Sequence, residues 1–159
     1  MYDFGGLQDR YAIAEIIQQV AQAFDQKLHD SLLKESFTPD AVIHYWLDGK
    51  LIDFSMPQGT ELFKYYHDRC YWTQHLVSPQ IVEVEACRAR AVTPVHAVHV
   101  QILDDGSRNN WLIGATYHDE LERRQEGWRI RHRTVSCPYV DGNFLEDGIQ
   151  LFPSLPSYR

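Results

Sequence analysis

Apolar residues recur at helical spacing through the first part of the chain. This period predicts an amphipathic helix from residue 7 to about residue 25. Its apolar positions are Tyr11, Ile13, Ile17, Val20 and Phe24. A short second helix is expected over residues 30–37, where the turn Thr38-Pro39-Asp40 ends it. Pro57 suits the first turn of a third helix that runs to about Tyr71.

The pattern changes to that of β-strands in the rest of the chain. Segments rich in β-branched and aromatic residues predict strands over residues 41–47, 51–54, 76–84, 89–103, 111–124 and 128–136. Asp48-Gly49, Asp105-Gly106 and Glu126-Gly127 are typical of turns between strands. After Cys137, scattered glycine, proline and aromatic residues favour irregular structure.

Helices followed by antiparallel strands are typical of the α+β class. We expect a cone-shaped α+β barrel, in which a curved sheet wraps around three N-terminal helices. The open mouth of such a cone is a natural ligand site. The length of 159 residues fits a single domain over residues 1–159, and no repeat or linker divides it.

Charge and cysteine content narrow the class of protein. The formal net charge of −7 argues against a nucleic-acid binder, which needs a basic patch. The cysteines number three and form no CxxC pair, so free thiols in a reducing compartment are expected. Neither a membrane-length apolar run nor the pattern of a secretion signal is visible. We therefore expect a cytoplasmic protein that does not bind membranes.

Asp25 and His75 are the candidates for proton transfer. Asp25 lies near the end of the first helix, where the helix dipole disfavours a carboxylate. The carboxylate of Asp25 is either solvated at the point where the helix stops, or it interacts with a partner residue. His75 precedes apolar Leu76 and Val77, and it is either a structural residue or a proton carrier. A carboxylate beside one ring nitrogen would fix the tautomer and leave the other nitrogen as a base.

Strand parity selects further candidates. His96 and His99 have opposite parity on one long strand, so one should face the interior and the other water. Tyr45 and Tyr117 share parity with apolar neighbours, which predicts buried rings, bonded either to backbone or to a ligand. Arg133 either binds an anionic substrate group or lies on a solvated face of the sheet.

Motifs for other chemistries are absent from the sequence. There are eight histidines, but no HxH, HExxH or Cys/His quartet occurs, so no metal site is expected. No Ser-His-Asp order, glycine-rich phosphate loop or dinucleotide fingerprint appears. Nothing activates Cys137 as a nucleophile. The remaining chemistry is cofactor-free proton transfer, namely elimination, isomerisation or hydration.

At these residues the chain resembles scytalone dehydratase and the SnoaL-like family of the nuclear-transport-factor-like superfamily. Phe24-Asp25 resembles the pair that closes the first helix, although the dehydratase has tyrosine in place of Phe24. Ile43-His44-Tyr45 is similar to the strand that ends in a catalytic tyrosine, and Thr73-Gln74-His75 to the Thr-Gln-His that carries the central acid/base. His99 falls on the second catalytic histidine, and residues 142–152 are similar to an aromatic tail that closes the pocket.

A second member of the same fold, hexachlorocyclohexane dehydrochlorinase, also resembles this chain. Leu112-Ile113-Gly114, Tyr117 and residues 119–124 are similar to its penultimate strand. Its catalytic aspartate and histidine correspond to Asp25 and His75, whereas its first-helix lysine is replaced here by Val20.

These resemblances imply a cofactor-independent, dehydratase-like lyase that acts on a small cyclic or polyketide-like hydroxyketone. Asp25 would orient His75, and His75 would take a proton from the carbon next to the carbonyl. Tyr45 would stabilise the enolate oxygen, and His99 would donate a proton to the departing hydroxide. The candidate substrate contacts are Tyr117, Arg133, Phe24, Trp72 and Phe144.

The resemblance also bears on assembly. Related enzymes are commonly trimers, so a homo-oligomer is expected, with a dimer as the alternative. The tail over residues 137–159 would close the pocket or pack on a neighbouring subunit, and Phe144, Leu145, Leu151 and Phe152 give it apolar surface.

Three other functions stay open because a fold does not decide a function. A ketosteroid-isomerase-like enzyme needs a base and oxyanion donors but no leaving group. A non-catalytic module would bind a small ligand in the same cone. The small subunit of a ring-hydroxylating dioxygenase shares the fold and would need a large iron-bearing partner.

Overall fold

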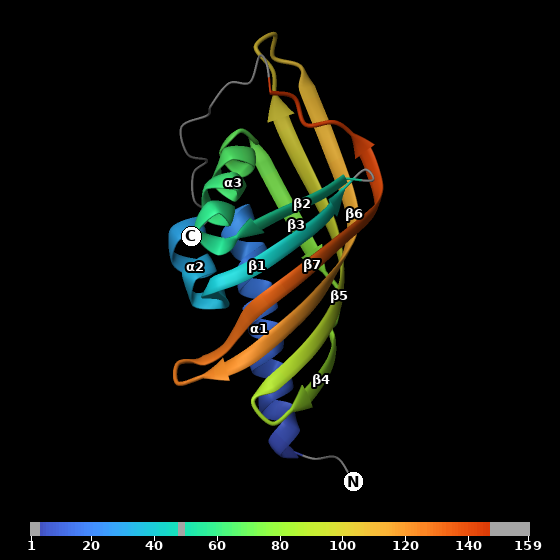
Figure 1. Cartoon of the computed structure of the whole chain (residues 1–159). Coiled ribbons are helices and arrows are strands. Elements are labelled where there is room, and N and C mark those ends of the chain that lie inside the picture. The colour runs from blue at the N-terminus through green and yellow to red at the C-terminus, as the bar shows by residue number, and fades with distance from the viewer. Residues whose placement is uncertain (1–3, 48–49, 147–159) are drawn as a thin grey trace.

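The computed structural model describes residues 4–47 and 50–146 (Figure 1). The helices are α1 (Phe4–Asp25), α2 (His29–Ser36) and α3 (Met56–Asp68). The strands are β1 (Phe37–Leu47), β2 (Lys50–Ser55), β3 (Trp72–Val77), β4 (Ile81–Glu85), β5 (Arg88–Ile102), β6 (Arg108–Arg124) and β7 (Gly127–Gly142). Within these ranges, no helix has both the length and the apolarity that a membrane span requires.

The described strands form one open, curved sheet in the order β2-β1-β7-β6-β5-β3, with β4 paired to β5. Strands β1 and β7 run parallel, while the other paired strands are antiparallel. Figure 1 shows the sheet wrapped around α1, with α2 and α3 beside β1 and β2. The expected α+β cone with three helices and a mixed sheet is therefore confirmed.

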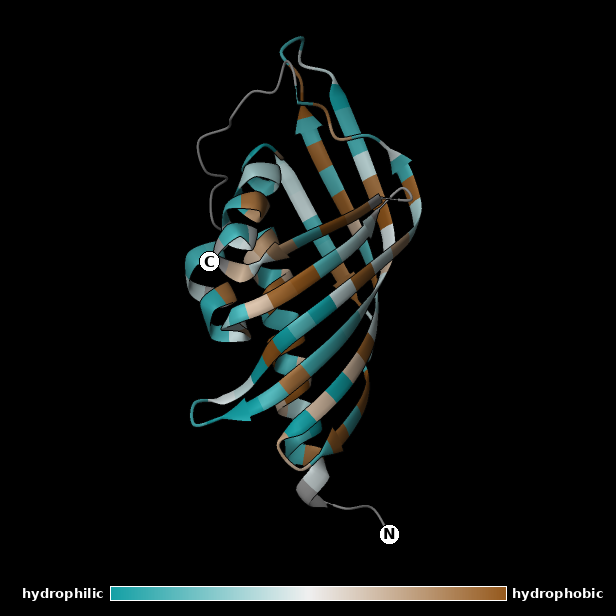
Figure 2. Ribbon diagram, in the orientation of Figure 1, coloured by the Kyte–Doolittle hydropathy of each residue, from teal (hydrophilic) through white to brown (hydrophobic). Residues whose placement is uncertain are grey.

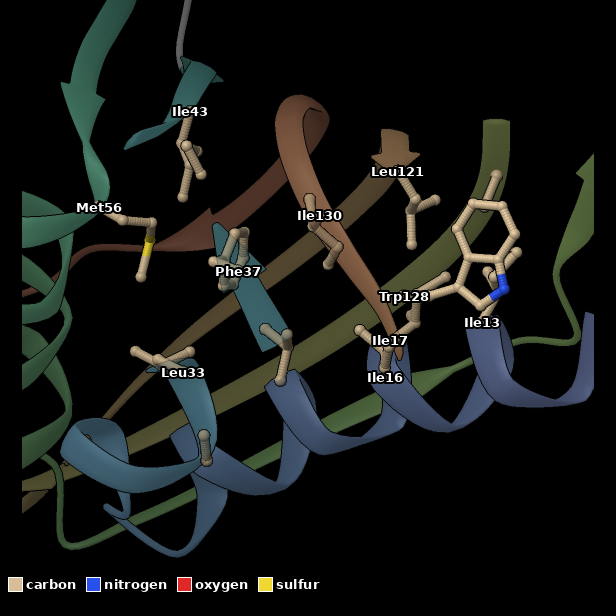
Figure 3. Packing of buried hydrophobic residues seen from close by; sticks show 14 of the residues in the cluster. Ile13, Ile16, Ile17, Leu33, Phe37, Ile43, Met56, Leu121, Trp128 and Ile130 are labelled. Atoms are coloured by element: carbon tan, nitrogen blue, oxygen red, sulfur yellow. The ribbon is translucent and has the colours of Figure 1, made fainter. Parts of the chain in front are cut away.

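The hydrophobic core forms where the apolar face of α1 meets the inner face of the sheet. Ile13, Ile17 and Val20 are fully buried. Figure 3 shows the isoleucines of α1 pointing towards Trp128 and Ile130. Apolar and polar residues alternate along the strands in Figure 2, because only one face of the sheet packs on the core.

Three expectations about the strands need correction. The segment 76–84 is two strands rather than one, since residues 78–80, which include Pro79, separate β3 from β4. The segment Thr38-Pro39-Asp40, which was expected to form a turn, lies instead within β1. The register of β1 against β7 shifts there, between Phe37 and Val42. Strand β7 continues to Gly142, because β6 pairs with the segment after Cys137. The expected Asp48-Gly49 turn lies outside the described residues.

A buried ion pair joins the two longest neighbouring strands. Asp119 on β6 and Arg133 on β7 are register partners. Arg133 Nε and Nη2 donate to the two carboxylate oxygens of Asp119 at 2.6 and 2.8 Å. Their side chains are 2% and 0% exposed, and the guanidinium lies 4.0 Å from the centre of the Tyr117 ring. Arg133 therefore lies on the buried face and not on a solvated one.

Replacing Arg133 with methionine should strongly destabilise the fold. Asp119 would keep its charge in a buried site without a partner, which costs about 3–5 kcal/mol. Urea unfolding followed by circular dichroism measures the change in the free energy of unfolding. Arg131→Met is the matched control on the same strand, because Arg131 is 46% exposed and should change stability by less than about 1 kcal/mol. Equal losses in both variants would contradict the importance of the buried pair.

Candidate functional site

An apolar cavity of about 170 Å³ lies inside the cone, beyond the end of α1. The helix α1 ends at Asp25, and beyond it the cavity lies between the inner face of the sheet and α3, which contributes Phe63 and His67 to the wall. Small side chains such as Ala97 and Ala115 line the wall there and leave space. Aromatic rings form most of the remaining wall, and the polar lining groups are Tyr45, Tyr66, His67, His75, His99, Trp111, Tyr117 and Cys137.

Asp25 and His75 meet at the cavity, although fifty positions separate them in the chain. The Nδ1 atom of His75 lies 2.7 Å from Asp25 Oδ1, and the backbone N–H of His75 donates to Asp25 Oδ2 at 2.9 Å. The carboxylate only accepts, so Nδ1 carries the proton, and in the neutral ring Nε2 keeps a free lone pair. The side chain of His75 is 6% exposed and that of Asp25 is 25% exposed.

The end of α1 is held against β3 by two further contacts. Thr73 donates its hydroxyl to the carbonyl of Phe24 at 3.4 Å. Lys27, which has a positive φ of 56° just after the helix, donates its Nζ at 2.9 Å to the carbonyl of Cys70, shortly before β3. These bonds explain how a helix end and a strand far away in sequence place a carboxylate and an imidazole together.

His99 is the inward-facing histidine of β5, and His96 is exposed, which confirms the parity expectation. The Nδ1 atom of His99 lies 3.2 Å from the carbonyl oxygen of Trp111, so Nδ1 carries the proton. Burial and the nearby His75 lower the pKa of His99 to about 4. The ring is therefore neutral at pH 7, and its Nε2 accepts a hydrogen bond instead of donating a proton.

Two histidines of the site were missed from the sequence. His67, on the last turn of α3, lines the cavity, and its Nδ1 lies 3.1 Å from Nε2 of His29. Burial lowers the pKa of both rings, that of His67 well below its ordinary value. The available signal was the spacing of Phe63 and His67, which places both on one face of α3.

Tyr45 and Tyr117 both contribute to the cavity wall. Burial raises the pKa of Tyr45 well above its ordinary value and that of Tyr117 to about 12, so both phenols stay protonated at neutral pH. Neither hydroxyl hydrogen-bonds to any other residue in the described part of the chain. Both can therefore donate to a ligand.

The other expected contacts differ in their placement. Phe24 lines the cavity and packs against His75 with the two rings tilted and their centres 5.2 Å apart. Trp72 is 39% exposed and lies outside the wall. Arg133 is held by Asp119 behind Tyr117, and it does not reach the cavity lining. Phe144 packs on Tyr66 from outside the lining, with ring centres 4.7 Å apart. The rest of the aromatic tail lies outside the described residues.

The chain belongs to the SnoaL-like domain family, whose sequence model matches residues 6–134. This family is part of the NTF2-like superfamily. No curated protein sequence matches the chain significantly.

Solved structures share the fold along nearly the whole chain. A protein of Kribbella flavida has 21% identity and a TM-score of 0.77, and covers 86% of this chain and 95% of its own. A scytalone dehydratase-like protein of Novosphingobium aromaticivorans has 15% identity and a TM-score of 0.73, with coverage of 97% and 96%. A hexachlorocyclohexane dehydrochlorinase of Novosphingobium barchaimii has 21% identity and a TM-score of 0.72, with coverage of 96% and 99%. At these identities the likeness establishes the fold.

Asp25→Asn should change the tautomer of His75. An asparagine side chain can donate to Nδ1, which favours the proton on Nε2, whereas the native carboxylate requires it on Nδ1. Imidazole nitrogen NMR at neutral pH with a chelator present measures the protonated nitrogen. Asp53→Asn is the matched control, because Asp53 forms an exposed pair with His44 and should leave His75 unchanged. A native His75 protonated at Nε2 would contradict the geometry.

Proposed function

We propose that this protein is a cofactor-independent lyase that eliminates water from a small cyclic hydroxyketone. The observation that carries the proposal is the hydrogen bond between Asp25 and Nδ1 of His75 at the wall of an apolar cavity. That bond leaves the lone pair of Nε2 as the base. General-base catalysis by a positioned imidazole contributes about 10²–10⁴-fold.

The first step removes the proton from the carbon next to the substrate carbonyl. The carbon–hydrogen bond breaks, the proton moves to Nε2 of His75, and the electron pair passes into the enolate. Asp25 stabilises the imidazolium that forms, because it already accepts the hydrogen of Nδ1. Both carboxylate oxygens of Asp25 are engaged by His75, so the ring keeps its orientation during the transfer.

Two of the cavity phenols, Tyr45 and Tyr117, supply the oxyanion donors. Tyr45 and Tyr117 line the largely apolar cavity, and burial keeps their hydroxyls protonated at neutral pH. Donors fixed before the reaction, in a region of low dielectric, stabilise the developing enolate charge without reorganisation. Tyr117 is thereby a second oxyanion donor beside Tyr45.

The second step expels the hydroxyl group from the neighbouring carbon. The carbon–oxygen bond breaks, the enolate electrons form the new carbon–carbon double bond, and hydroxide leaves. The proton that His75 took up at Nε2 goes to this hydroxide and forms water. His99 accepts a hydrogen bond from the substrate hydroxyl through Nε2 and so positions the leaving group, because its own proton is held at Nδ1 by Trp111.

The names of some structural neighbours support elimination, although another neighbour is named as an aromatic ring hydroxylase. Two of them are named as a scytalone dehydratase-like protein and a dehydrochlorinase, and both names describe removal of a group across a carbon–carbon bond. The cavity volume of about 170 Å³ fits a small molecule. We also propose that the protein forms a homo-oligomer, either a trimer or a dimer. Light scattering measures the mass of this assembly.

His75→Ala should lower the turnover of a cyclic β-hydroxyketone substrate by at least about 100-fold, because the base is removed. Mass spectrometry of the product measures loss of one water, and circular dichroism verifies that the variant is folded. His96→Ala is the matched control, since His96 lies exposed on β5. Full activity in His75→Ala would contradict the mechanism. A product that keeps every oxygen of the substrate would select the ketosteroid-isomerase-like reaction instead.

A further inference from the structure

Three histidines from three separate elements converge at one side of the cavity. His67 comes from α3, His75 from β3 and His99 from β5. Each offers one ring nitrogen, and these three nitrogens lie within 4.8 Å of one another. The rings of His67 and His99 are stacked, with centres 5.8 Å apart, while the ring of His75 is edge-on to both.

Each ring has a hydrogen-bond partner on its outer nitrogen. Nδ1 of His75 bonds to Asp25, Nδ1 of His67 to Nε2 of His29, and Nδ1 of His99 to the carbonyl of Trp111. Within residues 4–47 and 50–146, no protein group bonds to the Nε2 atoms of the three rings. Carboxylates, backbone carbonyls and water on the outer nitrogen are the usual supports of metal-binding histidines, since they fix the tautomer and the ring orientation.

The donor set selects the class of cation. Three neutral imidazoles suit zinc and its neighbours in the transition series, whereas magnesium and calcium require oxygen ligands. The Asp25 carboxylate does not compete as a ligand, because both of its oxygens are bound to His75. Tetrahedral zinc with bonds of about 2.0–2.1 Å needs nitrogens about 3.3 Å apart. The three side chains must therefore turn inward by an ångström or more on binding.

We propose that His67, His75 and His99 bind one zinc ion through their Nε2 atoms, with the fourth position open to the cavity. Metal and proton compete for the same lone pair of His75. Zinc therefore blocks the base of the proposed lyase reaction and acts as a reversible inhibitor. Zinc binding itself does not depend on the lyase function, whereas the inhibition rests on it.

Isothermal titration of the chelator-treated full chain with zinc, in the presence of a competing chelator, measures affinity and stoichiometry. One zinc per chain is expected. Cobalt(II) in place of zinc should give the visible absorption of a tetrahedral site, and X-ray absorption should show about three imidazole ligands. Absence of stoichiometric binding, or a spectrum with mostly oxygen ligands, overturns the proposal.

Variants identify the ligands. His67→Ala should weaken zinc binding by at least about 100-fold, and Asp25→Asn, which changes only a supporting contact, by about 10- to 100-fold. His96→Ala is the matched control and should leave the affinity unchanged. Equal losses in His67→Ala and His96→Ala would place zinc on surface histidines and overturn the site. Because His67→Ala removes a cavity side chain, circular dichroism and the cobalt spectrum are read on the same folded sample.

The two proposals can fail separately. Zinc binding by a chain that shows no lyase activity after chelation keeps the metal site and removes the lyase. Lyase activity in the chelated chain without zinc binding removes the metal site and keeps the lyase. If both are present, zinc should suppress turnover at the affinity measured by titration, and a chelator should restore it.

Discussion

The carboxylate of Asp25 is the contact on which the site depends. It accepts from both the backbone N–H and the ring N–H of His75, and so ties the end of α1 to β3. The dipole of α1 disfavours a negative charge at this end of the helix. The two hydrogen bonds from His75 offset that cost and hold the imidazole in one tautomer. A residue poorly suited to its own helix is thus explained by a partner from another part of the fold.

The cavity concentrates neutral polar groups in an apolar wall. Burial lowers the pKa of His67 and His99 and raises that of Tyr45 and Tyr117, so imidazoles and phenols alike are uncharged at neutral pH. Such a site offers lone pairs and O–H donors without fixed positive charge. That combination suits proton removal next to a carbonyl, and the same lone pairs suit a transition metal. The SnoaL-like cone positions these groups but does not by itself select the chemistry.

The local sequence pattern predicts most of the helices and strands, and the remaining differences from the structure arise where tertiary pairing decides the outcome. The three- to four-residue spacing of α1 and the alternation along β5 predicted the helix, the strand and the opposite orientations of His96 and His99. The effect of a proline depends on its tertiary context. Pro79 separates two strands of the predicted segment, while Pro39 lies inside β1, where an irregular register accommodates it. The extension of β7 to Gly142 depends on pairing with β6 and not on its own composition.

The sequence by itself determined the α+β class, the order of most elements and the alternation of side chains along the strands, because these follow from short-range periodicity. Only the tertiary structure decided which polar side chains meet. Asp25 hydrogen-bonds to His75, and Asp119 holds Arg133 outside the cavity lining. His67 lies close to His75 and His99. Such contacts are set by the curvature of the sheet and by how the helices dock on it. Spacing along the chain carries no measure of either.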